Sequence, residues 1–337
     1  MIQYDFFKQR LDKVIQTVID KNIIIYGCNR GGDYIRWFLE YYYSKKIKAI
    51  MDRWELLPIK TVPHLWALYY IYDKDDIIIN TTPFSIPDEF TDTGENWKEV
   101  LYTKNQIINL WDVLYGNNDL GDGKEFRQIT FYDWLEAEYK LDIVKTIQRK
   151  YVGTGHGYFP TDFRMIYEGI RQCGINPEYD NVLDIGSGKG SAVIALLACG
   201  FRRVGAVEYT QGIYDVLIDN LKKLEISVFE NLTVKSEGVS CYLMDASQMK
   251  TELDGYNWFF MFNPFSMNVL IKVIDNICES IRRKPRKCFI FYAEPIGHQY
   301  ILNTGIFECY KQVVSDFSDV SYYAYIYRSK GDLNNEN

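Results

Sequence analysis

Three carboxylates, each following a short apolar run, are the residues in this chain best suited to chemistry. Asp184 ends the first run, Glu208 follows 24 residues later, and Asp245 ends a third run. Ionised carboxylates accept hydrogen bonds from neutral donors such as hydroxyl groups. In open α/β sheets, ligands bind outside the carboxyl ends of the strands. The pattern therefore predicts a ligand pocket at one edge of a parallel sheet.

A glycine-rich turn follows the first of these runs. It reads Gly186-Ser187-Gly188-Lys189-Gly190 and leads into a helix at 192–198. Glycines let the backbone approach a ligand where a β-carbon would clash. A dinucleotide site usually reads Gly-x-Gly-x-x-Gly, whereas the spacing here is Asp-x-Gly-x-Gly-x-Gly. This spacing resembles the first motif of the class I S-adenosylmethionine (SAM) methyltransferases.

That resemblance implies roles for residues along the sheet edge. The turn residues Gly186, Ser187, Gly188 and Gly190 would pass under the methionine and ribose of SAM. Glu208, with Tyr209 beside it, would accept hydrogen bonds from the ribose hydroxyls. Asp245 would accept from the adenine amino group, and the backbone amide of Ala246 would reach a ring nitrogen. SAM would leave as S-adenosylhomocysteine, and we expect no metal.

The nearly all-apolar run at 257–262 predicts a central parallel strand, and it ends in Asn263-Pro264-Phe265-Ser266. In amino-methylating relatives this position reads Asn/Asp-Pro-Pro-aromatic, and it holds the methyl acceptor. Phe265 and Ser266 depart from that pattern, so amino-group chemistry cannot be carried over directly. Asn263 is a candidate for both cofactor contact and catalysis. His298 is a candidate general base, or else a loop histidine without such a role.

Residues 151–161 form a glycine-rich segment ahead of the turn. Its Tyr-x-Pro-Thr sequence, Tyr158 to Thr161, resembles a group of bacterial SAM methyltransferases that also have the Phe-Asn-Pro-Phe form. It is similar as well to the lid of the seven-strand nucleosomal lysine methyltransferases. The resemblance implies that Tyr158 and Thr161 touch the methionine end of SAM. The alternative is a plain loop, with Thr161 as the N-cap of a helix at 162–172.

The N-terminal part predicts a smaller domain of the same type. A helix at 2–20 and strands at 22–26, 47–51 and 76–80, with a helix at 33–43, have the spacing of a doubly wound fold. It resembles the small Rossmann-like domains attached to bacterial enzymes of sugar pathways. Gly27 to Gly32 is a dinucleotide fingerprint with Asn29 in place of its middle glycine. Arg30 and Asp52 could serve a nucleotide or nucleotide-sugar site, or the domain could be a scaffold.

The expected fold is therefore α/β, with two doubly wound Rossmann-like domains. The C-terminal sheet is expected to have seven strands, the last antiparallel. We place a small domain at 1–115, a linker at 116–130, the methyltransferase domain at 131–330, and a frayed tail at 331–337. Within the second domain, 131–160 is a helical and lid lead-in, with one helix over 131–150.

Composition limits the other function classes. The 337 residues carry a net charge of −7 with a pI of about 5.2, so we do not expect nucleic acid as a partner. The seven cysteines contain no Cys-x-x-Cys pair and predict reduced thiols in a cytoplasmic protein. Neither a signal peptide nor a membrane-spanning run is evident. The sequence leaves the oligomeric state open, and a homo-oligomer is compatible with it.

Three functions remain open from the sequence. The first is a SAM-dependent methyltransferase acting on a small molecule, sugar or glycan, with a nucleotide-linked acceptor as one form. The second is a protein or amine N-methyltransferase. The third is a non-catalytic module that binds SAM or nucleotides or mediates assembly. The joint presence of Asp184, Glu208 and Asp245 favours an enzyme.

Overall fold

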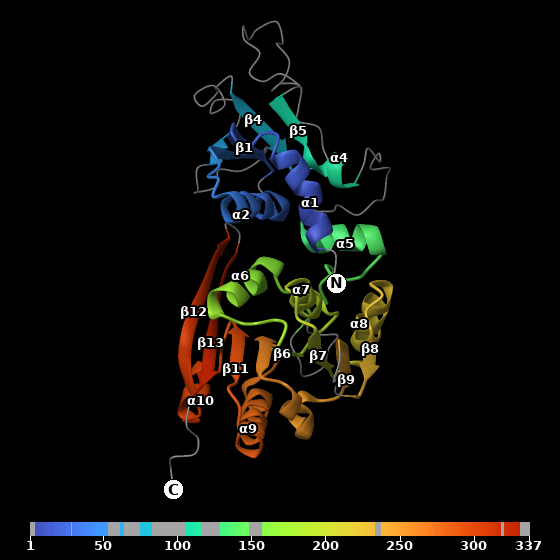
Figure 1. The fold of residues 1–337 in the computed structure, drawn as a ribbon, viewed down its shortest axis with the longest axis vertical. Coiled ribbons are helices and arrows are strands. Elements are labelled where there is room, and N and C mark those ends of the chain that lie inside the picture. Colours follow the sequence, from blue (N-terminus) through green and yellow to red (C-terminus); the bar gives the residue numbers. More distant parts are fainter. Residues whose placement is uncertain are drawn as a thin grey trace, which may run out of the picture. The chain divides into compact units, whose positions relative to one another are not determined.

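The chain forms two compact units, seen in a computed structural model (Figure 1). One unit comprises residues 3–138 with 317–320, and the other comprises 139–316 with 1–2 and 321–337. The structure describes residues 4–27, 29–52, 61–63, 75–82, 106–115, 129–147, 157–232, 237–317 and 320–330. Residues 116–128 of the predicted linker at 116–130 lie outside the described residues, as do the tail at 331–337 and Cys28.

The first unit contains a parallel five-stranded sheet in the order β3-β2-β1-β4-β5. Its strands are β1 (Asn22–Tyr26), β2 (Ala49–Asp52), β3 (Thr61–Pro63), β4 (Asp76–Asn80) and β5 (Ile107–Asn109). The central strand carries three consecutive isoleucines, Ile23 to Ile25, all fully buried, as expected for a strand covered on both faces. The order reverses between β1 and β4, which confirms the doubly wound prediction.

Within the described residues, the helices of this unit are α1 (Tyr4–Ile15), α2 (Arg30–Tyr43), α4 (Leu110–Tyr115) and α5 (Phe131–Tyr139). Phe7 of α1 packs its ring against Phe131 and Trp134 of α5, so α5 belongs to the core of this unit. The sequence analysis placed 131–138 with the second domain and assigned no helix or strand to 106–115. Short elements such as β5 and α4 lack the length over which periodicity can be recognised.

The second unit contains an eight-stranded sheet in the order β12-β13-β11-β10-β6-β7-β9-β8. Its strands are β6 (Asn181–Ile185), β7 (Arg203–Glu208), β8 (Val228–Glu230), β9 (Gly238–Leu243), β10 (Trp258–Phe262), β11 (Phe289–Ala293), β12 (Phe307–Phe317) and β13 (Val320–Ser329). The strands from β11 to β8 in this order run parallel, and β13 is antiparallel to β11. The predicted architecture is confirmed, with β8 as an additional edge strand.

Helices cover both faces of this sheet. They are α6 (Phe163–Cys173), α7 (Ser191–Ala198), α8 (Gln211–Lys223), α9 (Met267–Arg283) and α10 (His298–Asn303), with the 3₁₀ helices η4 (Ala246–Gln248) and η5 (Thr251–Gly255). Gly169 of α6 lies against the ring of Phe291, whereas Ile290 and Tyr292 join the core beneath α9. Successive strand residues face opposite sides, so α6 and α9 lie on opposite faces.

The predicted single helix over 131–150 is wrong. Helix α5 ends at Tyr139, and Lys140 has a left-handed backbone with φ of 57°. The backbone N–H and C=O of Asp142 are bonded to the buried carboxamide of Asn220 on α8. These bonds use the polar groups of Asp142 outside any helix, so tertiary contacts override the local apolar pattern.

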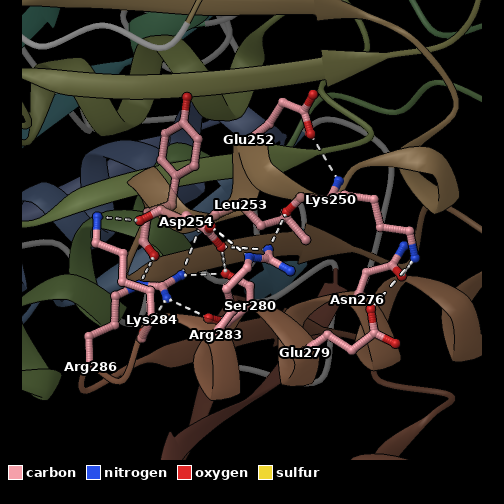
Figure 2. A network of polar contacts seen from close by, with 11 residues as sticks. Lys250, Glu252, Leu253, Asp254, Asn276, Glu279, Ser280, Arg283, Lys284 and Arg286 are labelled. Atoms are coloured by element: carbon pink, nitrogen blue, oxygen red, sulfur yellow. Dashed lines mark hydrogen bonds and ion pairs between the residues drawn. The ribbon is translucent and has the colours of Figure 1, made fainter.

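The basic end of α9 has a structural role, which Figure 2 shows. The Arg286 guanidinium donates to the carbonyl oxygens of Leu253 and Tyr256 at 2.8 and 2.7 Å and to the Ser280 hydroxyl at 3.0 Å. Arg283 donates to the Asp254 carboxylate, which holds the pKa of Asp254 below its ordinary value. These contacts join the end of α9 to η5, so the two arginines serve the fold.

Replacing Arg286 by lysine should destabilise the second unit. Lysine keeps the charge but cannot present donors in several directions, so partly buried carbonyls at 253 and 256 lose their partner. We expect a loss of about 1–3 kcal/mol in the free energy of unfolding, measured by urea denaturation. Lys272→Ala, at an exposed position on the same helix, serves as the control and should change stability by less than about 0.5 kcal/mol. Equal stability of the two variants would contradict this role.

Candidate functional site

The order of the second sheet reverses at β6 and β10, and the candidate site lies at the carboxyl ends of these strands. After β6 the chain turns through Gly186 and Gly188, whose φ angles of 83° and 54° are in the left-handed region. The backbone N–H groups of Gly186 and Ser187 both donate to the Val207 carbonyl at 3.0 Å. The turn is thereby fixed to the neighbouring strand β7.

The Glu208 carboxylate lies directly against this turn. It accepts hydrogen bonds from the backbone N–H of Gly188 at 3.1 Å, of Tyr209 at 3.0 Å and of Thr210 at 2.8 Å. With 9% exposure, the residue is almost buried. The N–H groups of Gly186, Ser187 and Gly188 are therefore bonded to Val207 and Glu208 and are not open to a pyrophosphate, and Glu208 adds a negative charge at this turn.

Asp184 adds a second buried carboxyl beneath the turn. It is 2% exposed, and its Oδ2 atom has no hydrogen-bond partner among the described residues. Burial, together with the neighbouring Glu208 carboxylate, raises the pKa of Asp184 well above its ordinary value. The buried Ser187 hydroxyl also lacks a partner within the described part of the chain. Two such atoms beside a glycine turn fit a ligand that brings polar groups, as SAM does.

Asp245 and its neighbours extend the edge beyond β9. The Asp245 side chain is exposed and accepts from the Ser247 N–H at 2.8 Å, capping η4. The Met244 N–H donates to the Glu208 carbonyl at 3.1 Å, which places this loop beside the end of β7. Tyr209 is 50% exposed and Ala246 is buried. The structure thus brings the residues predicted for the nucleoside side to one edge.

Asn263 and Pro264 bring the end of β10 onto the same turn. A β-carbon placed on Gly186 would stand 2.4 Å from the Pro264 Cβ, so the two residues are in close contact. Asn263 has a left-handed backbone with φ of 37°. Non-glycine residues rarely adopt this conformation, although asparagine tolerates it best, and such residues gather at functional sites. The predicted acceptor position therefore adjoins the predicted cofactor turn.

Known proteins resemble this chain only distantly. No family model matches it, and no curated protein does. Similar solved structures include a ribosomal protein L11 methylase from Lactobacillus delbrueckii, at 12% identity and a TM-score of 0.37, covering 53% of this chain and 82% of that one. A protein from Escherichia coli, provisionally described as a methyltransferase, has 14% identity and a TM-score of 0.36, with 51% and 89% covered.

A Pyrococcus horikoshii protein, provisionally described as an RNA methyltransferase, is similar at 14% identity and a TM-score of 0.36, covering 52% of this chain and 83% of that one. These structural neighbours include methyltransferases of the Rossmann-like type, all at low identity. Similarity at this level does not identify the substrate, so the function of this chain is argued below from its own residues.

Tyr158 contacts the turn, and Thr161 contacts the first residue of the helix behind it. The Tyr158 ring occupies the space where a β-carbon on Gly188 would lie, and its hydroxyl donates to the Ile143 carbonyl at 2.7 Å. The Thr161 N–H donates to the Ser191 hydroxyl. Helix α6 begins one residue later than the alternative interpretation required, because Asp162 is its N-cap. Residues 151–156 of this segment lie outside the described chain.

Lys189, inside the turn, is a residue whose importance the sequence analysis missed. It is 3% exposed, and its ammonium donates to the Asp142 carboxylate and, at 3.0 Å, to the Lys145 carbonyl. It also lies 5.5 Å from the centre of the Tyr158 ring. A lysine between two turn glycines is the only sequence signal for this role. The residue ties 142–145 and Tyr158 to the cofactor turn.

His298 lies away from the strand ends. Its Nδ1 atom hydrogen-bonds the Tyr327 hydroxyl at 2.8 Å, and its ring packs on Tyr325, 4.5 Å between centres. Tyr327 is fully buried in the core beneath α9. This environment gives the histidine a packing role on the face of the sheet, and its role as a general base remains a prediction.

In the first unit, α2 begins where a dinucleotide would be expected to bind. Asn29 is the N-cap of α2, accepting from the Gly32 N–H at 2.9 Å. Arg30 is bonded to Asp133 at 2.6 Å, and Asp133 also accepts from Thr130. Asn29 thus stands at the position of the missing glycine and serves as a helix cap. The Arg30 guanidinium, which could have bound a phosphate, is instead paired with Asp133 of the same unit. We favour the scaffold interpretation of this domain.

Within the described residues, no group of three or more His, Cys, Asp or Glu side chains gathers in a metal-binding arrangement. Among the same residues, no helix combines the length and the apolar character that a membrane span requires.

Asp184→Asn should change how stability depends on pH. The raised pKa means that folded Asp184 keeps its proton at a pH where the unfolded chain, with a pKa of about 3.9, has lost it. The wild-type apoprotein should therefore lose stability relative to Asp184→Asn as pH rises above about 4, by up to about 1.4 kcal/mol per pH unit until the folded pKa is passed. Thermal unfolding at pH 5 and pH 8 measures this difference.

Asp219→Asn, at an exposed site paired with Lys223, is the control for Asp184→Asn and should follow the wild-type pH profile. Parallel profiles for wild type and Asp184→Asn would contradict a raised pKa at Asp184.

Lys189→Met should loosen the segment that Lys189 holds. Methionine keeps the buried stem but removes the donors to Asp142 and Lys145, each a charge-assisted bond. The amides of Asp142 and Ile147, bonded to Asn220 and to the Tyr158 carbonyl, should exchange with deuterium about 10–100-fold faster. Lys222→Met, at an exposed site on α8, should leave these rates unchanged. Unchanged exchange in Lys189→Met would rule out the anchoring role.

Proposed function

We propose that this chain is a SAM-dependent methyltransferase whose cofactor binds at the carboxyl ends of β6, β7 and β9. The observation that carries this proposal is the position of the Glu208 carboxylate against a turn whose amides are already bonded. A pyrophosphate would meet negative charge there and few free donors. A nucleoside with two ribose hydroxyls and a positively charged group would instead meet acceptors.

Each residue has a distinct part in this proposal. Glu208 would accept from the ribose hydroxyls, and Asp245 would accept from the adenine amino group, with Tyr209 and Ala246 lining the ring. Asp184 and Ser187 would meet polar groups of the methionine part, and Tyr158 and Thr161 would support that end. When bound, SAM supplies a methyl group on a sulfonium, which is already a good leaving group. The chain then has to align the acceptor and receive a proton, and positioning alone can account for much of the rate.

The methyl acceptor is proposed to lie beside Asn263, at the end of β10. From the sequence we had favoured a small molecule, sugar or glycan over a protein or amine. The close contact of Pro264 with Gly186 supports the place of the acceptor, because it brings Asn263 next to the turn that would hold the methyl donor. The carboxamide of Asn263 can accept hydrogen bonds from a nucleophile carrying N–H or O–H groups.

Calorimetric titration with SAM and with S-adenosylhomocysteine tests the cofactor. We expect binding to the wild type, and binding weaker by about 10–100-fold in Glu208→Gln and Asp245→Asn, since each variant loses a charge-assisted acceptor. Glu237→Gln, at an exposed position, is the matched control. Thermal unfolding of each variant separates loss of binding from loss of fold. Absence of SAM binding to the folded wild-type protein would falsify the proposal.

Transfer of radiolabelled methyl groups identifies the acceptor class. The substrates to compare are sugars, nucleotide sugars, small amines, peptides and RNA. Binding of SAM without transfer to any of them, and without turnover in a cell extract, would favour a non-catalytic module.

A further inference from the structure

Strand β11, which pairs with β10, is followed like β10 by a polar residue, a proline and an apolar residue. Strand β10 is followed by Asn263-Pro264-Phe265, and β11 is followed by Glu294-Pro295-Ile296. The two strands pair in parallel, with Phe262 opposite Ala293 as the last aligned pair. Asn263 and Glu294 are therefore the first residues after the last aligned pair of two neighbouring strands. A glutamate thus follows the strand beside the one that leads to the proposed acceptor position.

Both residues also share an uncommon backbone conformation. Asn263 has φ of 37° and Glu294 has φ of 50°. Asparagine tolerates the left-handed region, but glutamate has no such preference, and a residue held there costs about 1–3 kcal/mol. Strain of this kind persists only where the surrounding structure enforces it.

The surroundings of Glu294 do enforce its position. Its backbone N–H donates to the Tyr323 carbonyl at 2.9 Å, and the backbone of Ile296 hydrogen-bonds the Tyr292 hydroxyl. Gly297 packs against Leu270 of α9 so closely that a β-carbon there would stand 2.3 Å from its Cδ2. Glu294 is half-buried. A strained, firmly supported carboxylate at a strand end is typical of a positioned functional group.

We propose that Glu294 is the catalytic carboxylate of the acceptor side, and that with Asn263 it binds an amine nitrogen and receives its proton. This inference rests on the proposed function and narrows it to N-methylation. An anionic carboxylate and a neutral carboxamide at the ends of neighbouring strands offer two acceptors, and the negative charge favours an amine, which binds as its ammonium ion, over a neutral hydroxyl. The amine class was the second choice from the sequence alone.

The chemical step balances with these groups. The nitrogen lone pair forms the new bond to the methyl carbon, while the carbon–sulfur bond breaks and its electron pair stays on sulfur. The donor leaves as neutral S-adenosylhomocysteine, and the positive charge passes to the methylated nitrogen. The nitrogen has this lone pair only after its ammonium form has given one proton to the Glu294 carboxylate, which passes the proton to water. General-base assistance of this kind contributes about 10²–10⁴-fold to a rate.

Sinefungin tests the inference without knowledge of the acceptor. This SAM analogue carries a carbon with a protonated amine where SAM has its methylsulfonium, so its amine occupies the place of the transferred methyl. We expect the wild type to bind sinefungin at least about tenfold more tightly than S-adenosylhomocysteine, because the amine gains a charge-assisted bond. Glu294→Gln should abolish this preference and leave the affinity for S-adenosylhomocysteine within about twofold of wild type.

The control is Glu225→Gln, since Glu225 is an exposed glutamate that also has a left-handed backbone, with φ of 56°. It should keep the preference, whereas Glu294→Asp, with a shorter carboxylate, should keep part of it. A full sinefungin preference in folded Glu294→Gln would overturn the role of Glu294 and leave the methyltransferase proposal standing. Failure of S-adenosylhomocysteine to bind the wild type would instead overturn the proposed function, and this inference with it.

Discussion

The second unit depends on one interaction, the binding of the turn after β6 to the end of β7. Val207 accepts two turn amides through its carbonyl, and Glu208 accepts a third through its carboxylate. Buried amides must find acceptors, so this strand end completes the turn as well as lining the site. The residue proposed to recognise a ribose is thus also part of the fold. The site could not be altered there without altering the turn.

Much of this edge could be predicted because the signals were local. A buried strand, a glycine turn and a carboxylate at each strand end occupy fixed sequence positions, and parallel pairing brings strand ends together. The central strand β10 was identified from its unbroken apolar run, and it pairs with β6 and β11 as such a strand should. Asp184, Glu208 and Asn263 lie at or just beyond the carboxyl ends of β6, β7 and β10, and their roles toward a ligand stay predictions.

The errors came from contacts between distant parts of the chain. The apolar pattern over 131–150 gave no sign that Asn220 binds the backbone of Asp142, which is incompatible with a continued helix. The buried role of Lys189 depends on a partner 47 residues away in sequence. Glu294 follows β11, and the role proposed for it is argued only once β11 is aligned beside β10. The pairing register of two strands is a tertiary property, and it could not be predicted from this single sequence.

The contact between Gly186 and Pro264 has a consequence for how such a protein can diverge. The Pro264 ring fills the space above the Gly186 α-carbon, so the turn at 186 and the loop at 263–265 are closely packed with no gap between them. A larger residue at 186 would push the whole 263–265 loop outward rather than merely narrow a cavity. Related chains that differ at position 186 should therefore differ at position 264 as well, so the two positions should covary.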